Sequence, residues 1–113
     1  MTVPKMKKDG KVAVLVAPGY GAGWTTWNHG PENLTETALF HRELVQLVLD
    51  GRQAEATEEL VLRLAGLADG HFYDNGRHDL VVEWVDEGDR FRLTEYDGHE
   101  DLELLNLVKH YVA

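Results

Sequence analysis

The segment Lys11–Ala17 (KVAVLVA) constrains the fold more than any other part of the chain. It is apolar and β-branched almost throughout, without the alternation of apolar and polar side chains that a half-exposed strand shows. A strand of this kind is covered by other elements on both of its faces. We therefore expect residues 11–17 to form a central strand, which Pro18 ends.

Size and composition indicate one folded domain. The chain has 113 residues, enough for a modest core, with 43% apolar and 27% charged residues. Cysteine is absent, which excludes disulfides, thiolate metal ligands and cysteine nucleophiles. The apolar runs are too short for a membrane span, and the first residues lack the apolar segment of a secretory signal, so we expect a cytoplasmic protein.

The charge balance narrows the classes of partner. Twenty acidic and 11 basic side chains give a formal net charge of -9. General nucleic-acid binding is not expected, because that affinity depends on lysine and arginine displacing counterions. A local site for a small phosphorylated ligand remains open, because backbone N–H groups and a few arginines can build one. The acidity itself suits either solubility or a face that docks a basic partner or mimics nucleic acid.

Two helices are expected after the first strand. Asn33 and Glu36 have the spacing of a capping box, and apolar residues then recur at helical spacing. Helices at 34–50 and 53–68 follow, with Gly51 suited to the position just past the first helix. The short connection predicts an αα-hairpin.

The second half of the chain suggests β-structure. Two apolar segments flank the turn-like residues 86–89 and predict a hairpin over residues 80–96. In the register that separates apolar from polar side chains, Trp84 faces Phe91. The same register places Glu95 on the side that faces the core.

The predicted fold is therefore a small single α+β domain over residues 1–113. A mostly antiparallel sheet, with central strand 11–17 and hairpin 80–96, packs against the αα-hairpin of 34–50 and 53–68. Residues 1–10 are expected to be a loose N-terminal segment. For residues 102–113 helix and strand both remain open, and we favour a helix or turn that ends in a short strand.

The loop after the first strand, APGYGAGWTTWN, is the main candidate site. The spacing of Gly19, Gly21 and Gly23 does not fit the dinucleotide fingerprint, and a Walker lysine is absent. Glycines still allow a tight turn that exposes backbone N–H groups to a ligand. Trp24 and Trp27 fit two interpretations, stacking on a ring-shaped ligand or plugging the core.

A second cluster of polar residues surrounds Glu95 and Asp97. An inward carboxylate here could bind ligand hydroxyls, or it could cap the backbone amides of the loop. Both interpretations bring the loop and this strand end together.

Catalytic and metal chemistry find little support. The histidine spacings match no standard metal site, and serine is absent, while Thr25 and Thr26 have no visible base. We expect no cofactor and no metal. An acid–base pair, if there is one, would be Glu95 with His78 or His99.

The runs VLVAPGYGAGWTTWN and FRLTEYDGHE resemble a family of small, largely uncharacterised proteins of bacteriophages and their host bacteria. The resemblance implies no catalytic residues. It implies a setting in which small phage proteins interfere with host defence, by capturing a nucleotide second messenger or by covering a host protein in the host cytoplasm.

The sequence thus gives two hypotheses. The first is a non-enzymatic, homo-oligomeric protein whose loop 18–30 binds a nucleotide-like or phosphorylated ligand. The alternative is an acidic protein–protein module that covers a basic host partner. The residues predicted to bind the ligand are Tyr20, Gly21, Ala22, Gly23, Trp24, Trp27, Asn28, Arg77, Arg92, Glu95 and Asp97.

Overall fold

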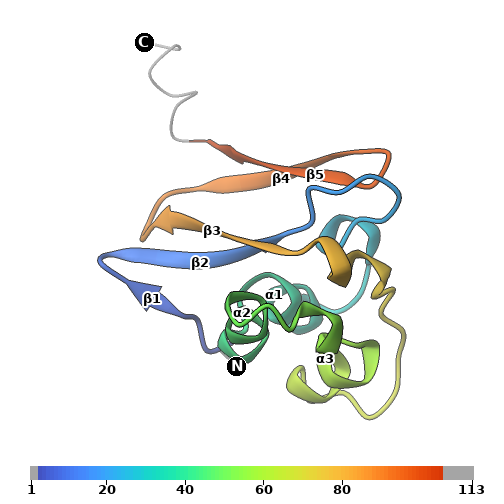
Figure 1. The fold of residues 1–113 in the computed structure, drawn as a ribbon. Helices are drawn as coiled ribbons and strands as arrows, with labels where there is room; N and C mark the ends of the chain where they lie inside the picture. Colours follow the sequence, from blue (N-terminus) through green and yellow to red (C-terminus); the bar gives the residue numbers. More distant parts are fainter. Residues whose placement is uncertain (1–2, 106–113) are drawn as a thin grey trace.

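The computed structural model describes residues 3–105, which form three layers (Figure 1). The strands are β1 (Lys7–Lys8), β2 (Lys11–Val16), β3 (Val81–Asp86), β4 (Phe91–Tyr96) and β5 (His99–Leu104). The helices are α1 (Glu32–Phe40), α2 (Arg42–Leu49) and α3 (Glu58–Leu64). An antiparallel sheet of order β1-β2-β3 lies in the middle, with helices on one face and the antiparallel pair β4–β5 over the other. The predicted α+β class is confirmed.

Strand β2 is the central strand, as predicted. It pairs with β1 on one side and β3 on the other. Ala13 and Leu15 belong to the core under the helices, whereas Val14 and Val16 belong to the core under β4–β5. These four side chains are at most 1% exposed. The uniformly apolar sequence of β2 therefore reflects two covering layers.

The predicted hairpin over residues 80–96 is wrong in its pairing, although both of its strands exist. β3 pairs with β2, and β4 pairs with β5. Trp84 packs against the helix-side core, whereas Phe91 packs against the core on the opposite face of the sheet. The helices cover one face of β2, and its apolar side chains on the other face also need a covering layer. The chain turns at residues 86–89, and β4 forms part of that second layer instead of pairing with β3.

The predicted helix 34–50 is broken at His41. The backbone of His41 is extended, its N–H ends α1 by donating to Thr37, and its ring Nδ1 accepts the N–H of Glu43 to begin α2. Residues 4 and 5, far from His41 in the sequence, form the contacts that stabilise this break. The N–H of Arg42 donates to the carbonyl of Pro4, beside a β-bridge of residue 5 to His41.

Two further helix predictions need correction. The helix 53–68 is reduced to a single 3-10 turn at Gln53–Glu55 followed by α3. The capping box fails, because α1 begins at Glu32 and the side chain of Asn33 donates instead to the carbonyl of Ala65 in the neighbouring helix end (2.7 Å). The predicted role of Gly51 holds, with φ at +72° just past α2.

The chain ends differ from prediction where they are described. β1 lies within the expected loose segment 1–10, and Val3 is buried. Within 102–113, residues 102–104 belong to β5, and residues 106–113 lie outside the described part. Of the helices in residues 3–105, none is long and apolar enough to cross a membrane.

The break at His41 predicts a pH dependence of stability. Burial lowers the pKa of His41 below its usual 6.5. Near and below pH 6.5 the unfolded chain therefore binds more protons at this residue than the folded chain does. The stability that the neutral His41 ring contributes is fully present above pH 6.5 and decreases as the pH falls below that value. Urea unfolding at pH 7.5 and 5.5 should show a smaller loss for His41→Asn than for wild type, because asparagine also accepts an N-cap hydrogen bond. The exposed His29→Asn serves as control, and equal losses in all three proteins would contradict the assignment.

Candidate functional site

A buried carboxylate organises the loop after β2, here called the aromatic loop (residues 18–28). Glu100 of β5 is 0% exposed. Its Oε1 accepts the N–H of Ala17 (3.0 Å). Its Oε2 accepts the N–H groups of Trp24 (2.8 Å) and Thr26 (2.9 Å), and the Thr26 hydroxyl (2.5 Å). One side chain therefore joins the end of β2, the middle of the loop and β5.

These contacts satisfy amides that an external anion would otherwise bind. The four groups that contact Glu100 all donate, and a carboxylate is the side chain that accepts only. The N–H of Gly21, a predicted anion ligand, donates to the carbonyl of Asp97 (2.9 Å). The Glu100 carboxylate and the Asp97 carbonyl thus occupy loop N–H groups that an anion would otherwise bind.

Two glycines let neighbouring segments approach the aromatic loop closely. Gly98 has φ at +87°, and a Cβ there would lie 2.5 Å from the backbone nitrogen of Ala22. A Cβ on Gly76 would lie 2.3 Å from the carbonyl oxygen of Gly23. The aromatic loop and the end of β4 are in contact, as expected, but the backbone of Ala22 and Gly23 is covered by Gly98 and Gly76.

Trp24 is a core residue. It is 0% exposed, its Nε1 donates to the carbonyl of Ala38 (2.8 Å), and its ring meets Phe72 edge-to-face at 4.7 Å. Of the two interpretations for this tryptophan, core packing is the one the structure supports. Its ring is not available for stacking on a ligand.

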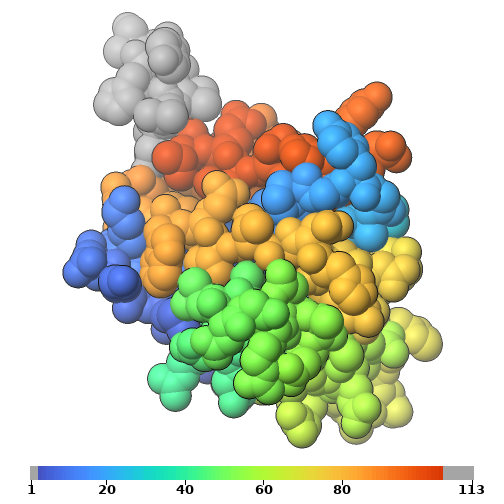
Figure 2. Space-filling model, viewed as in Figure 1, coloured from blue at the N-terminus to red at the C-terminus, as the bar shows by residue number. Residues whose placement is uncertain are grey.

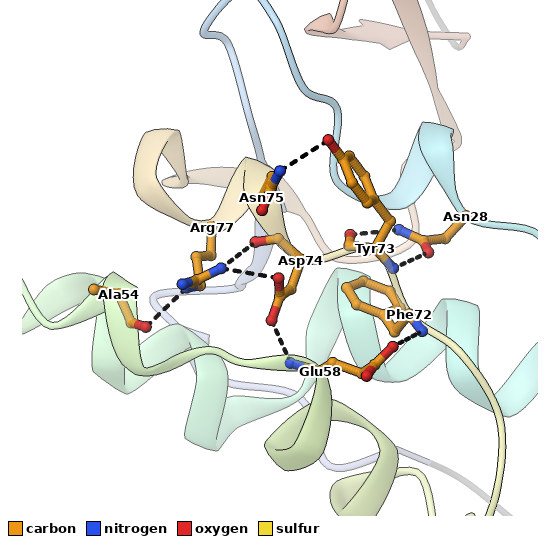
Figure 3. A network of polar contacts seen from close by, with 8 residues as sticks. All are labelled: Asn28, Ala54, Glu58, Phe72, Tyr73, Asp74, Asn75 and Arg77. Carbon is orange, nitrogen blue, oxygen red and sulfur yellow. Dashed lines mark hydrogen bonds and ion pairs between the residues drawn. The ribbon is translucent and has the colours of Figure 1, made fainter.

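Trp27 stays at the surface, 37% exposed, and stacks on Tyr73 with 5.6 Å between ring centroids. Asn28, the next residue, is hydrogen-bonded to the backbone of Tyr73 (Figure 3). The Asn28 Oδ1 accepts the N–H of Tyr73 (2.7 Å), and the Asn28 Nδ2 donates to the Tyr73 carbonyl (3.1 Å). The side chain thus forms the same pair of backbone hydrogen bonds that a residue of a neighbouring strand would form. It also donates to the carbonyl of Trp24 (2.7 Å). The predicted ligand contact Asn28 is thus engaged in joining two segments.

Arg77 is engaged within the same region (Figure 3). Its guanidinium donates to the carbonyl of Ala54 (2.9 Å) and to the carboxylate of Asp74 (2.9 Å). The other carboxylate oxygen of Asp74 accepts the N–H of Glu58 at the start of α3 (2.6 Å), and Glu58 accepts the N–H of Phe72 (2.8 Å). This network anchors segment 72–77 to the helices.

Tyr20 lies at the other end of the loop, 68% exposed, and stacks on His99 with 4.8 Å between centroids. His99 donates from Nδ1 to the carbonyl of Pro18, and its Nε2 lies 3.3 Å from Asp101. Tyr96 is directly opposite His99 in the β4–β5 ladder and is 77% exposed. These side chains form an exposed aromatic patch beside carboxylates.

The remaining predicted residues take other positions. Glu95 lies opposite Glu100 in the ladder, on the core-facing side as expected, yet it is exposed and accepts the N–H of Gly98 (2.7 Å). Arg92 forms an exposed ion pair with Glu103 (3.0 Å). No hydrogen bond within residues 3–105 joins Glu95 to His78 or His99, and no group of three potential metal ligands gathers there.

Sequence reasoning gave the possible capping role to Glu95 and no role to Glu100. The turn Asp97–Gly98 carried the signal, because a two-residue turn pairs position 95 with position 100 and puts both on one face. Tyr73 was also missed, and no local pattern marks it.

Comparison with known proteins found no matching family model, no matching curated protein and no matching solved structure. The resemblance to small phage proteins therefore stays a prediction.

Removal of the Glu100 carboxylate tests its organising role. Glu100→Ala leaves the buried N–H groups of Ala17 and Trp24 without an acceptor, at about 1–3 kcal/mol each, so the free energy of unfolding should fall by at least about 2 kcal/mol. Glu103→Ala, which breaks an exposed ion pair in the same strand, should cost about 1 kcal/mol or less. Urea denaturation followed by circular dichroism measures both changes. Equal losses for the two variants would contradict the role given to Glu100.

Proposed function

We propose that the protein is a protein–protein interaction module that binds a basic partner through the aromatic loop and its neighbouring tyrosines. The observation that carries the proposal is the contact of Glu100 with the loop amides. It fixes the loop backbone before any partner arrives. A surface that is already ordered loses little conformational entropy on binding, so more of the contact energy becomes affinity.

The side chains left outside are those that dominate protein interfaces. Tyr20 and Tyr96 are more than two-thirds exposed, and Tyr73 and Trp27 are 44% and 37% exposed. Tyrosine and tryptophan are enriched among interface hot spots, because they bury much apolar area with few rotatable bonds. Single exposed aromatics are ordinary, but these four belong to the aromatic loop or to the segments held against it.

The charge distribution favours a basic partner. Asp79 lies against Gly19, and Asp97 and Asp101 adjoin the patch of Tyr20 and His99. The lysines of residues 3–105 all fall between positions 5 and 11, at the opposite end of β2. With a net charge of -9 and the lysines of residues 3–105 at the other end of β2, the described surface around this patch presents a negative field, which steers cationic surfaces toward it.

Capture of a small phosphorylated ligand stays a prediction with weaker geometric support. The amides of Gly21, Trp24 and Thr26 already have protein acceptors, and Arg77 is tied to Asp74. A hollow of about 370 Å³ beside this region is lined by residues that include two carboxylates and no lysine or arginine, namely Glu58, His71, Phe72, Tyr73 and Asp74. Such a lining repels phosphate.

The proposal predicts that the double substitution Tyr20→Ala and Tyr96→Ala abolishes partner binding without unfolding the protein. Both side chains are exposed, so stability should change by less than about 0.5 kcal/mol for each. Affinity purification from a bacterial lysate, with quantitative mass spectrometry, should recover a basic protein with wild type and lose it at least tenfold with the variant.

Leu49→Ala is the matched control, because Leu49 is a 49% exposed apolar residue of α2 outside the patch, and it should retain the partner. Absence of any recovered protein, together with stabilisation of wild type by nucleotides in a thermal-shift screen, would refute the interaction module and favour ligand capture.

A further inference from the structure

The two edges of the middle sheet are built differently. The edge at β1 is two residues long and consists of Lys7 and Lys8, a short lysine edge that resists pairing with other chains. The edge at β3 is six residues long, and its sequence VVEWVD contains no proline and no lysine. The register with β2 is continuous from residue 81 to 86, so no bulge interrupts it. Only one edge of this sheet is therefore protected.

The hydrogen-bond pattern shows which groups of β3 point outward. The N–H of Glu87 donates to the carbonyl of Gly10, so this pair is hydrogen-bonded, and bonding alternates along an antiparallel ladder. Residues 81, 83 and 85 therefore bond β2, whereas the N–H and C=O groups of Val82 and Trp84 point away from it. The N–H of Ala13, opposite Trp84, donates away from β3 to Met6, in agreement with this assignment.

These outward groups have no partner among residues 3–105. No hydrogen bond joins the backbone of Val82 or Trp84 to a described residue on the outer side. Figure 2 shows β3, in golden orange, at the surface between the β4–β5 layer and the helices. The edge is thus accessible to an extended chain.

The exposed side chains along this edge indicate which residues a strand bound beside β3 would carry. Val81 is 41% exposed, and Glu83, two residues along on the same face, is exposed and forms no ion pair within the described part of the chain. A strand laid beside β3 would place one side chain opposite each of them. Opposite charges across a ladder stabilise it and like charges destabilise it, so Glu83 favours a basic residue and opposes a symmetric pairing of two copies centred on itself.

We propose that the open edge of β3 binds an extended segment of a partner by strand addition, with a basic residue opposite Glu83 and an apolar residue opposite Val81. The main-chain groups of Val82 and Trp84 supply the affinity, and the two side chains supply the selectivity. This site uses different residues from the aromatic loop, so it stands whether or not the loop binds a partner.

The probe is the capped heptapeptide Thr-Val-Thr-Lys-Thr-Val-Thr, compared with the same peptide carrying glutamate in place of lysine. Titration followed by amide NMR should shift the signals of Val82 and Trp84, with about fivefold tighter binding of the lysine peptide. Glu83→Lys should reverse this preference. Glu59→Lys, an equal change of charge at an exposed position of α3, should keep it.

Methylated peptides test the backbone pairing without altering the protein. In antiparallel addition, the two threonines that flank the lysine bond Val82 and Trp84, so N-methylation there should abolish binding, whereas N-methylation of the lysine itself should not. Unshifted β3 amides at millimolar peptide, or equal binding of both methylated forms, would overturn the proposal. A dimer in sedimentation with the Val82 and Trp84 amides already protected from exchange would also overturn it, because a second copy would then hold the edge.

Discussion

The contact of Glu100 with the backbone of the aromatic loop is the interaction on which the rest of the structure depends. A carboxylate removed from water is costly unless donors replace the lost hydration, and the three backbone amides and one hydroxyl at Glu100 do so. Because these donors belong to the end of β2 and to the loop, the same bonds fix where the loop runs. They also attach β5 to β2, and so hold the β4–β5 layer over the second face of the sheet. The inner core, the outer layer and the exposed aromatic surface are therefore parts of one arrangement.

Local signals in the sequence predicted what local physics decides. The apolar run of β2 indicated a strand covered on both faces, and Gly51 indicated the end of a helix because a left-handed backbone there favours glycine. The break at His41 depends on Pro4 and residue 5, and the contact of Asn33 depends on Ala65. No pattern within a helix window contains those partners, so helix periodicity predicted one continuous helix over 34–50 with a capping box at its start.

At the site, the sequence indicated the right kind of chemistry at the wrong residue. A carboxylate capping the loop amides was one of two interpretations for Glu95, yet Glu100 takes that position. The error follows from pairing β4 with β3. Asp97 and Gly98 have φ of 51° and 87°, the conformation of a tight hairpin turn, which makes β5 the partner of β4 and sets Glu100 opposite Glu95. The position of Trp24 was left open, because glycine and tryptophan in a loop fit both a core plug and a ligand platform.

The two proposed contact surfaces lie next to each other in the fold. Val81, at the start of the open edge, pairs with Val16, the last residue of β2, and the aromatic loop begins two residues later. Asp79, just before the edge strand, packs against Gly19 of that loop. An added strand rises about as much per residue as β3 does, so six residues of a partner would span β3, and a longer segment would continue toward the loop. A single basic segment can therefore meet Glu83 at the edge and the carboxylates beside Tyr20. The net negative charge then acts as a selective feature of both proposed surfaces.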